Sequence, residues 1–158
     1  VAALAVTNLV SWGEAERTRE ATDASEERFR RAFDDAPVAM CADKERRYLS
    51  RIGQVRPIAE VVAVAERYRG ELPIAVVSGG DGWLVKETLT AIGLLDWMDA
   101  VVGAEDTVRH KPDPDPFLEA ARRLAVPPET CVVFEDSDLG LEAGRRAGME
   151  AVDIRPWR

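Results

Sequence analysis

Two adjacent carboxylates, Glu135 and Asp136, follow directly on the apolar segment 131–134. Adjacent acids at the end of a buried strand repel each other unless a cation lies close to both of them. Hard oxygen donors of this kind suit Mg²⁺, which keeps several waters and bridges to a substrate phosphate. The pair therefore predicts a metal site. Ser137 or Asp138 could instead serve only as the cap of a following helix, but capping leaves the two preceding acids unexplained.

A second candidate group, Ser78, Gly79 and Gly80, follows another apolar segment, 73–77. A hydroxyl and closely approaching backbone N–H groups at a strand-to-helix turn can bind an anion. A Ser-Gly turn can equally be a plain connection between two elements. The pattern by itself leaves both interpretations open.

Lys111 is the third candidate, because it lies in a stretch that contains three prolines between residues 112 and 116. Prolines restrict the backbone and would hold this ammonium group in place, where it could neutralise a phosphate or orient a carboxylate. An exposed lysine in a rigid loop is the alternative. His110 is the only histidine of the chain. With no second histidine or suitable cysteine near it, we interpret His110 as a loop residue and not as a catalytic base.

The elements that must position these side chains alternate regularly after residue 72. Strands are expected at 73–80, 99–106, 131–136 and 150–154, and helices at 81–93, 115–126 and 137–148. Strands made almost wholly of Val, Ile, Ala and Phe that alternate with helices predict an α/β fold with a parallel sheet covered on both faces. Ligands of such sheets bind at the carboxyl ends of the strands, where all three candidate groups fall.

The first part of the chain lacks this regular alternation of strands and helices. Residues 1–34 are rich in Glu, Arg and Ala and are expected to be mostly helical, and further helical patterns cover 43–52 and 57–69. We therefore expect an N-terminal helical segment, 1–40, and a core, 41–158. The helix within residues 1–34 could pair with a helix of a partner protein.

Composition limits the remaining possibilities. The chain has 158 residues, a formal net charge of -8 and a pI near 4.8, which argues against binding to nucleic acid. Cys41 and Cys131 lie far apart among apolar neighbours, so we expect buried thiols and a reducing, cytoplasmic location. No apolar run has the length of a membrane span, and "VAALAV" lacks the flanks of a signal peptide, so no membrane partner is expected.

Taken together, the Ser78 turn, "HKPDPDPF" around Lys111 and "VVFEDSDLGLEAGRRAGM" from residue 132 resemble three motifs of the haloacid dehalogenase (HAD) superfamily of phosphohydrolases. The connecting sequence is similar to the branch that contains β-phosphoglucomutase and fructose-1-phosphate phosphatase, over residues 42–155. The resemblance implies a three-layer, Rossmann-like parallel sheet. It also implies Mg²⁺-dependent phosphoryl transfer, through an aspartyl-phosphate, from a small phosphorylated metabolite such as a sugar phosphate.

The same resemblance assigns roles to the candidate residues. Ser78 and the Gly79 backbone would bind the transferring phosphate, and Lys111 would bridge the phosphate and the nucleophile. Glu135 and Asp136 would serve the Mg²⁺.

The family's opening motif, Asp-x-Asp-Gly-Thr, is absent from this sequence. When "ALAVTNLVSW" is laid against it, Leu4 and Val6 take the places of the two aspartates. We therefore expect the central strand to be missing or replaced, and the helical cap to be absent or reduced to helices between residues 43 and 70. Residues 1–40 resemble the linker and start of PAS-type sensor proteins instead.

Asp43 is the candidate substitute nucleophile. The apolar run 38–42 could form a strand beside the Ser78 strand and present Asp43 at its end. These observations favour a HAD-like phosphohydrolase whose activity depends on such a replacement. The alternative is a non-catalytic module that binds phosphate and Mg²⁺, or that interacts with a partner.

Overall fold

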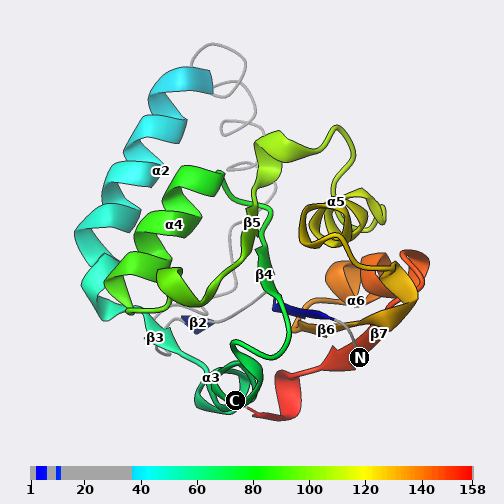
Figure 1. Cartoon of the computed structure of the whole chain (residues 1–158). Helices are drawn as coiled ribbons and strands as arrows, with labels where there is room; N and C mark the ends of the chain where they lie inside the picture. Colours follow the sequence, from blue (N-terminus) through cyan, green and yellow to red (C-terminus); the bar gives the residue numbers. More distant parts are fainter. Residues whose placement is uncertain (1–2, 7–9, 12–36, 158) are drawn as a thin grey trace. The chain divides into compact units, whose positions relative to one another are not determined.

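The computed structural model describes residues 3–6, 10–11 and 37–157. The chain forms two compact units. One comprises residues 1–11 and 56–158, and the other comprises residues 12–55. Figure 1 shows the helices and strands of both units.

A five-stranded parallel sheet in the order β5-β4-β1-β6-β7 forms the centre of the first unit. The strands are β1 (Ala3–Val6), β4 (Ile74–Val77), β5 (Ala100–Val102), β6 (Cys131–Glu135) and β7 (Glu150–Asp153). In β1, Val6 pairs with Val76 on one side and with Phe134 on the other. The central position is thus occupied by a strand from the start of the chain, whose sequence, ALAV, carries no aspartate.

Helices cover both faces of this sheet, as the alternating pattern predicted. On one face, Val61 of α3 (Ala59–Tyr68) and Leu89 of α4 (Gly82–Ala91) pack with Ile74 and Val76. On the other face, Phe117 of α5 (Asp115–Leu124) and Ala143 of α6 (Asp138–Arg146) pack with Ala75, Val77 and Val133. Neighbouring residues of β4 face opposite layers because side chains alternate along a strand. The three-layer α/β fold is confirmed.

Short elements complete the two units. In the first, β2 (Val10–Ser11) pairs antiparallel with β3 (Arg56–Pro57). Its described residues also form 3₁₀ turns, namely η2 (Leu95–Trp97), η3 (Ala104–Asp106), η4 (Pro128–Thr130) and η5 (Arg155–Trp157). The second unit contains α2 (Pro37–Arg51) and η1 (Ile52–Gln54). Of the helices that the structure describes, none is both long enough and apolar enough to cross a membrane.

Glycines end two of the helices as expected. Gly93, after α4, and Gly148, after α6, have φ angles of 72° and 78°. This left-handed region favours glycine, which has no Cβ to clash with the backbone.

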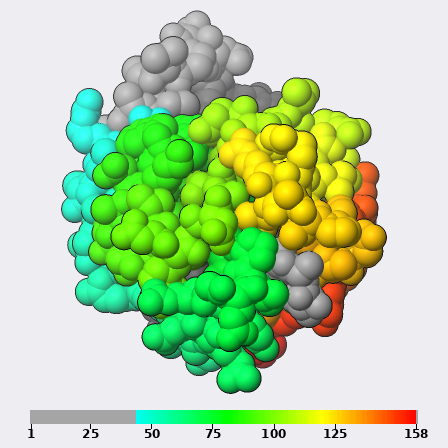
Figure 2. Space-filling view, in the orientation of Figure 1, coloured from blue at the N-terminus to red at the C-terminus, as the bar shows by residue number. Residues whose placement is uncertain are grey.

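In the space-filling view, the green segment that includes α4 and the yellow segment of α5 form much of the visible surface of the first unit (Figure 2).

Two expectations for the first 55 residues are wrong where the structure describes them. Residues 3–6 and 10–11 are strands and not helix, while 12–36 lie outside the described residues. The run 38–42 does not form a strand, because it continues as helix α2 together with Asp43. Pro37 suits the first turn of a helix, and no helix breaker follows it up to Arg51, so the helix extends through the apolar run. The domain boundary expected at residue 40 stays a prediction, while the compact units divide near residues 11 and 55.

The reduced cap was expected from helices between residues 43 and 70. Of these, α3 packs directly on the sheet through Val61 and Ala65 and so belongs to the core of the first unit. Only α2 lies in the second unit. The expectation is therefore wrong for α3.

Candidate active site

The carboxyl ends of the parallel strands meet at one edge of the sheet, and three residues lie at or just beyond these ends. Ser78 follows β4, Gly103 follows β5, and Glu135 ends β6. The strand order reverses at the central strand β1. Strands β4 and β5 lie on one side of β1, and strands β6 and β7 lie on the other side. Such a switch point is where open α/β sheets bind ligands. A cavity of about 110 Å³ lies at this edge, lined by Ser78, Gly79, Gly103, Thr107, His110, Lys111 and Pro116.

Ser78 is held at the start of the β4–α4 turn by two hydrogen bonds. Its backbone N–H donates to the Val102 carbonyl (2.9 Å), which extends the pairing of β4 with β5 by one residue. Its Oγ accepts the Gly80 N–H at 3.1 Å. Because this second bond uses an acceptor lone pair of the hydroxyl, the Ser78 O–H can still be donated to a ligand oxygen in the cavity.

Lys111 reaches the cavity from the loop before α5. Neighbouring residues fix the position of its ammonium group. Its Nζ donates to Glu135 Oε2 at 2.8 Å and to the Val77 carbonyl at 3.4 Å. The ammonium also lies 5.1 Å from the ring centroid of the buried Phe117, a favourable cation–π distance. An ammonium group has three donors. One remains for an oxyanion in the cavity.

Glu135 connects Lys111 to the start of α6. While Oε2 accepts from Lys111, Oε1 accepts from the Asp136 N–H, the Ser137 N–H and the Ser137 hydroxyl, at 3.2, 3.1 and 2.8 Å. Ser137 in turn caps α6 by accepting the Gly140 N–H. The Glu135 side chain is only 2% exposed. Its carboxylate is therefore a buried anchor for the lysine and the helix, a role that the sequence did not suggest.

A Mg²⁺ site at this edge would need oxygen ligands from the chain. The described residues contain no group of three or more His, Cys, Asp or Glu side chains that could hold a metal ion. Mg²⁺ often binds through one or two carboxylates, completing its shell with waters and substrate phosphate. Asp136, next to the anchored Glu135, suits such a shared shell. The residues therefore fit Mg²⁺ only together with a bound phosphate, and its binding stays a prediction.

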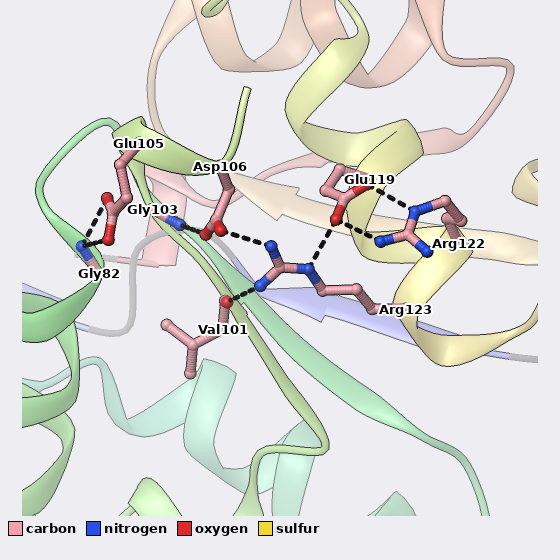
Figure 3. A network of polar contacts seen from close by, with 8 residues as sticks. All are labelled: Gly82, Val101, Gly103, Glu105, Asp106, Glu119, Arg122 and Arg123. Atoms are coloured by element: carbon pink, nitrogen blue, oxygen red, sulfur yellow. Dashed lines mark hydrogen bonds and ion pairs between the residues drawn. The ribbon is translucent and has the colours of Figure 1, made fainter. Parts of the chain in front are cut away.

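A polar network holds the loop that closes the cavity on the β5 side (Figure 3). Both carboxylate oxygens of Glu105 accept from the Gly82 N–H, at 3.0 Å, at the start of α4. Asp106 accepts from the Gly103 N–H at 2.7 Å and from Arg123 of α5. Arg123 also donates to the Val101 carbonyl on the edge of the sheet, at 2.7 Å. The loop is thus connected to β5, α4 and α5 at once.

Glu119 completes this network and makes the stability dependent on pH. Hydrogen bonds from Arg122 and then from Arg123 lower the pKa of Glu119 from 4.5 to about 2. A carboxyl group whose pKa is lower in the folded state stabilises the fold above its unfolded pKa, and that contribution disappears as the pH falls through the folded value.

We therefore expect Glu119→Gln to lower the free energy of unfolding by about 1 kcal/mol at pH 7, as for a partly exposed ion-pair network. The difference in the free energy of unfolding between Glu119→Gln and wild type should shrink as the pH falls from 4.5 to about 2. Urea denaturation at a series of pH values measures this difference. Glu142→Gln, a change of an exposed acid on α6, is the control for net charge. A Glu119→Gln deficit that stays constant down to pH 2 would contradict the assignment.

Comparison with known proteins identifies the family. The family model described as haloacid dehalogenase-like hydrolase matches residues 2–148. The chain belongs to this family. It is 41% identical over 120 residues to the fructose-1-phosphate phosphatase YqaB of Escherichia coli, covering 75% of this chain and 63% of that protein.

Solved structures of HAD proteins share the fold. A β-phosphoglucomutase from Clostridium difficile has a TM-score of 0.65 and 26% identity, covering 73% of this chain and 53% of that one. A HAD-superfamily hydrolase from Ehrlichia chaffeensis has a TM-score of 0.68 and 15% identity, covering 96% and 86% of the two chains. The present chain spans 63% of YqaB and 46% and 51% of the two next curated relatives, so about half to under two thirds of their lengths.

These matches also correct the interpretation of residues 1–40. The family match begins at residue 2, so this segment belongs to the HAD-like region and its likeness to a PAS linker has no support. The cavity brings together Ser78, Gly79 and Lys111, with Glu135 behind the lysine. Asp43 lies in α2 instead of at a strand end. The sequence interpretation missed Gly103 and Thr107, although both lie in the short segment between a strand and Lys111.

Proposed function

We propose that this chain carries the phosphate-recognition site of a HAD-like phosphohydrolase that acts on a small phosphorylated metabolite such as a sugar phosphate. The observation that carries the proposal is the position of Lys111, which lines the same cavity as Ser78 and is anchored by the buried Glu135. A phosphoryl group there would meet an ammonium N–H, a serine hydroxyl and the backbone of Gly79. Charge-assisted bonds of this kind are about twice as strong as neutral ones.

The substrate class follows from the chemistry of the cavity and from the relatives. At about 110 Å³ the cavity is well below the roughly 300–1,000 Å³ of sites that enclose a whole drug-sized ligand. It suits a phosphoryl group with the few atoms next to it. YqaB acts on fructose 1-phosphate by its name, and the match with it supports a sugar phosphate as the ligand here.

Mg²⁺ belongs to the same proposal, with Asp136 as a ligand and Glu135 next to it as the anchored acid. When bound, the ion would neutralise negative charge on the phosphate.

A second candidate function, binding without turnover, is favoured by the sequence of the central strand. A covalent aspartyl-phosphate requires a carboxylate nucleophile. The strand β1 is ALAV, and the first acidic residue of the chain is Glu14. A phosphoryl group held by Ser78 and Lys111 would then have no carboxylate from β1 to attack it.

Calorimetry and phosphate-release assays with fructose 1-phosphate and other sugar phosphates separate these functions. We expect binding, with phosphate release at the background rate. Ser78→Ala removes one hydroxyl and should weaken binding about tenfold, the effect of one hydrogen bond to a charged ligand. Thr90→Ala, an exposed hydroxyl on α4, is the matched control. No binding of any sugar phosphate would overturn the proposal, and Mg²⁺-dependent release would select turnover over the second candidate.

A further inference from the structure

Arg146, the last residue of α6, contacts the turn that carries Lys111. Its Nη1 donates to the Pro112 carbonyl and its Nη2 donates to Asp113 Oδ1, both at 3.0 Å. The guanidinium group thus bonds to the backbone of one residue and to the side chain of the next, directly after the lysine. A guanidinium presents its N–H groups in a rigid planar fork, so two such bonds specify the position of both partners.

The turn is closed around Lys111. The Asp113 N–H donates to the His110 carbonyl at 2.8 Å, so residues 110–113 form one hydrogen-bonded turn. The lysine is its second residue, and Arg146 holds its third and fourth residues. Because a closed turn has little backbone freedom, fixing two of its residues also fixes the Cα of Lys111 and the start of its side chain.

The two ends of the Lys111 side chain are therefore held separately, and together they decide where its third N–H points. At the far end, the ammonium donates to Glu135 and to the Val77 carbonyl. A tetrahedral nitrogen with two N–H groups engaged and its Cε in a set direction has one direction left for the third N–H. That direction changes if the backbone of the turn shifts, even when the bond to Glu135 persists.

Exposure limits what the Arg146 contacts can add to stability. The side chains of Arg146 and Asp113 are 45% and 34% exposed. Ion pairs of this exposure contribute little to the free energy of unfolding, because water and salt screen the charges. An effect on ligand affinity that is much larger than the effect on stability would therefore identify a positioning role.

We propose that Arg146 is a positioning residue for phosphate binding, which sets the direction of the Lys111 ammonium group through its bonds to Pro112 and Asp113. This inference rests on the proposed function and extends the site to the far end of α6. The guanidinium group acts through the turn and needs no contact with the ligand.

Arg146→Gln should increase the dissociation constant for inorganic phosphate about fivefold, the size expected when one member of a connected network is removed. The melting temperature should fall by no more than about 3 °C, as for an exposed ion pair. Arg146→Lys keeps the charge but lacks the fork that bonds to both partners. Its dissociation constant should stay at least about threefold above that of wild type, whereas a purely electrostatic effect of the arginine would leave it unchanged.

Arg145→Gln is the matched control, because Arg145 is the preceding residue of α6 and is also exposed. It removes the same charge and should bind phosphate within about twofold of wild type. Asp113→Asn keeps an acceptor oxygen for Arg146 and should also bind within about twofold. The experiment is isothermal calorimetry with inorganic phosphate on wild type and these four variants, combined with thermal denaturation without ligand.

Hydrogen exchange of the Asp113 amide reports the closed turn and tests the positioning without a ligand. Arg146→Gln should raise this exchange rate at least about twofold, and Arg145→Gln should not. Equal phosphate affinity of wild type and Arg146→Gln would overturn the inference, and so would equal weakening by Arg145→Gln or full recovery by Arg146→Lys. If wild type binds no phosphate, the proposed function itself fails, and this inference fails with it.

Discussion

Lys111→Met should lower the free energy of unfolding by about 3 kcal/mol and abolish phosphate binding. Methionine fills a similar volume but leaves the Glu135 carboxylate, which is 2% exposed, without its cation. Removal of one partner from a buried pair is costly because the remaining charge stays desolvated. The loss of binding follows separately, because the donor left over on the ammonium group is the one assigned to the phosphate. Urea denaturation and calorimetry with inorganic phosphate measure the two effects.

A double-variant cycle distinguishes this explanation from a general packing defect. Glu135→Gln removes the charge, so the Lys111→Met change should cost clearly less stability in the Glu135→Gln background than in wild type. Phosphate binding should not return in the double variant, since the lysine is still absent. Equal stability costs in the two backgrounds would show that the lysine and the glutamate are not coupled.

Gly140→Ala should destabilise the protein by about 3 kcal/mol, the upper range for overpacking in a core. A Cβ at this position would overlap the Glu135 carboxyl group and its Cγ. The glutamate cannot move away freely, because Lys111 and Ser137 hold its two oxygens from different sides. The substitution should therefore weaken phosphate binding as well, by displacing the anchor of Lys111.

Gly144 of the same helix provides the matched control. A Cβ there would lie 3.4 Å from Ala151 Cβ and 3.5 Å from Val133, which is ordinary van der Waals contact. Alanine is also the better helix former, by about 0.5–1 kcal/mol. Gly144→Ala should thus be neutral or stabilising and leave phosphate binding unchanged. Both free energies come from urea denaturation, and similar losses at the two glycines would contradict the close approach of Glu135 to α6.

Much of the fold could be predicted from the sequence because its signals are local. β4 and the first four residues of β6 are continuous apolar runs, and both strands are buried along their whole length, as strands covered on both faces must be. Gly93 and Gly148 marked the ends of α4 and α6 for a similarly local reason. The central strand had no such signal. Ala3–Val6 is four residues long, and its partners Ile74–Val76 and Cys131–Phe134 lie far along the chain.

The candidate site was predictable in part for the same reason. Ser78 and Lys111 stand out because turns and prolines surround them in the sequence. The role of Glu135 depends on a lysine 24 residues away and on a glycine in the first turn of α6, and a linear pattern does not reveal such contacts. The contact of Arg146 with the turn around Lys111 is likewise visible only once the chain is folded.

The central claim is that the cavity at the ends of β4 and β5 holds a phosphoryl group. The most direct measurement is a titration of the ¹⁵N-labelled chain with inorganic phosphate, followed by amide chemical shifts. We expect the largest saturating shifts at Gly79, Gly80 and Thr107, with Gly144 and Thr90 nearly unchanged. No saturating shifts, or shifts that map to residues away from this cavity, would contradict it.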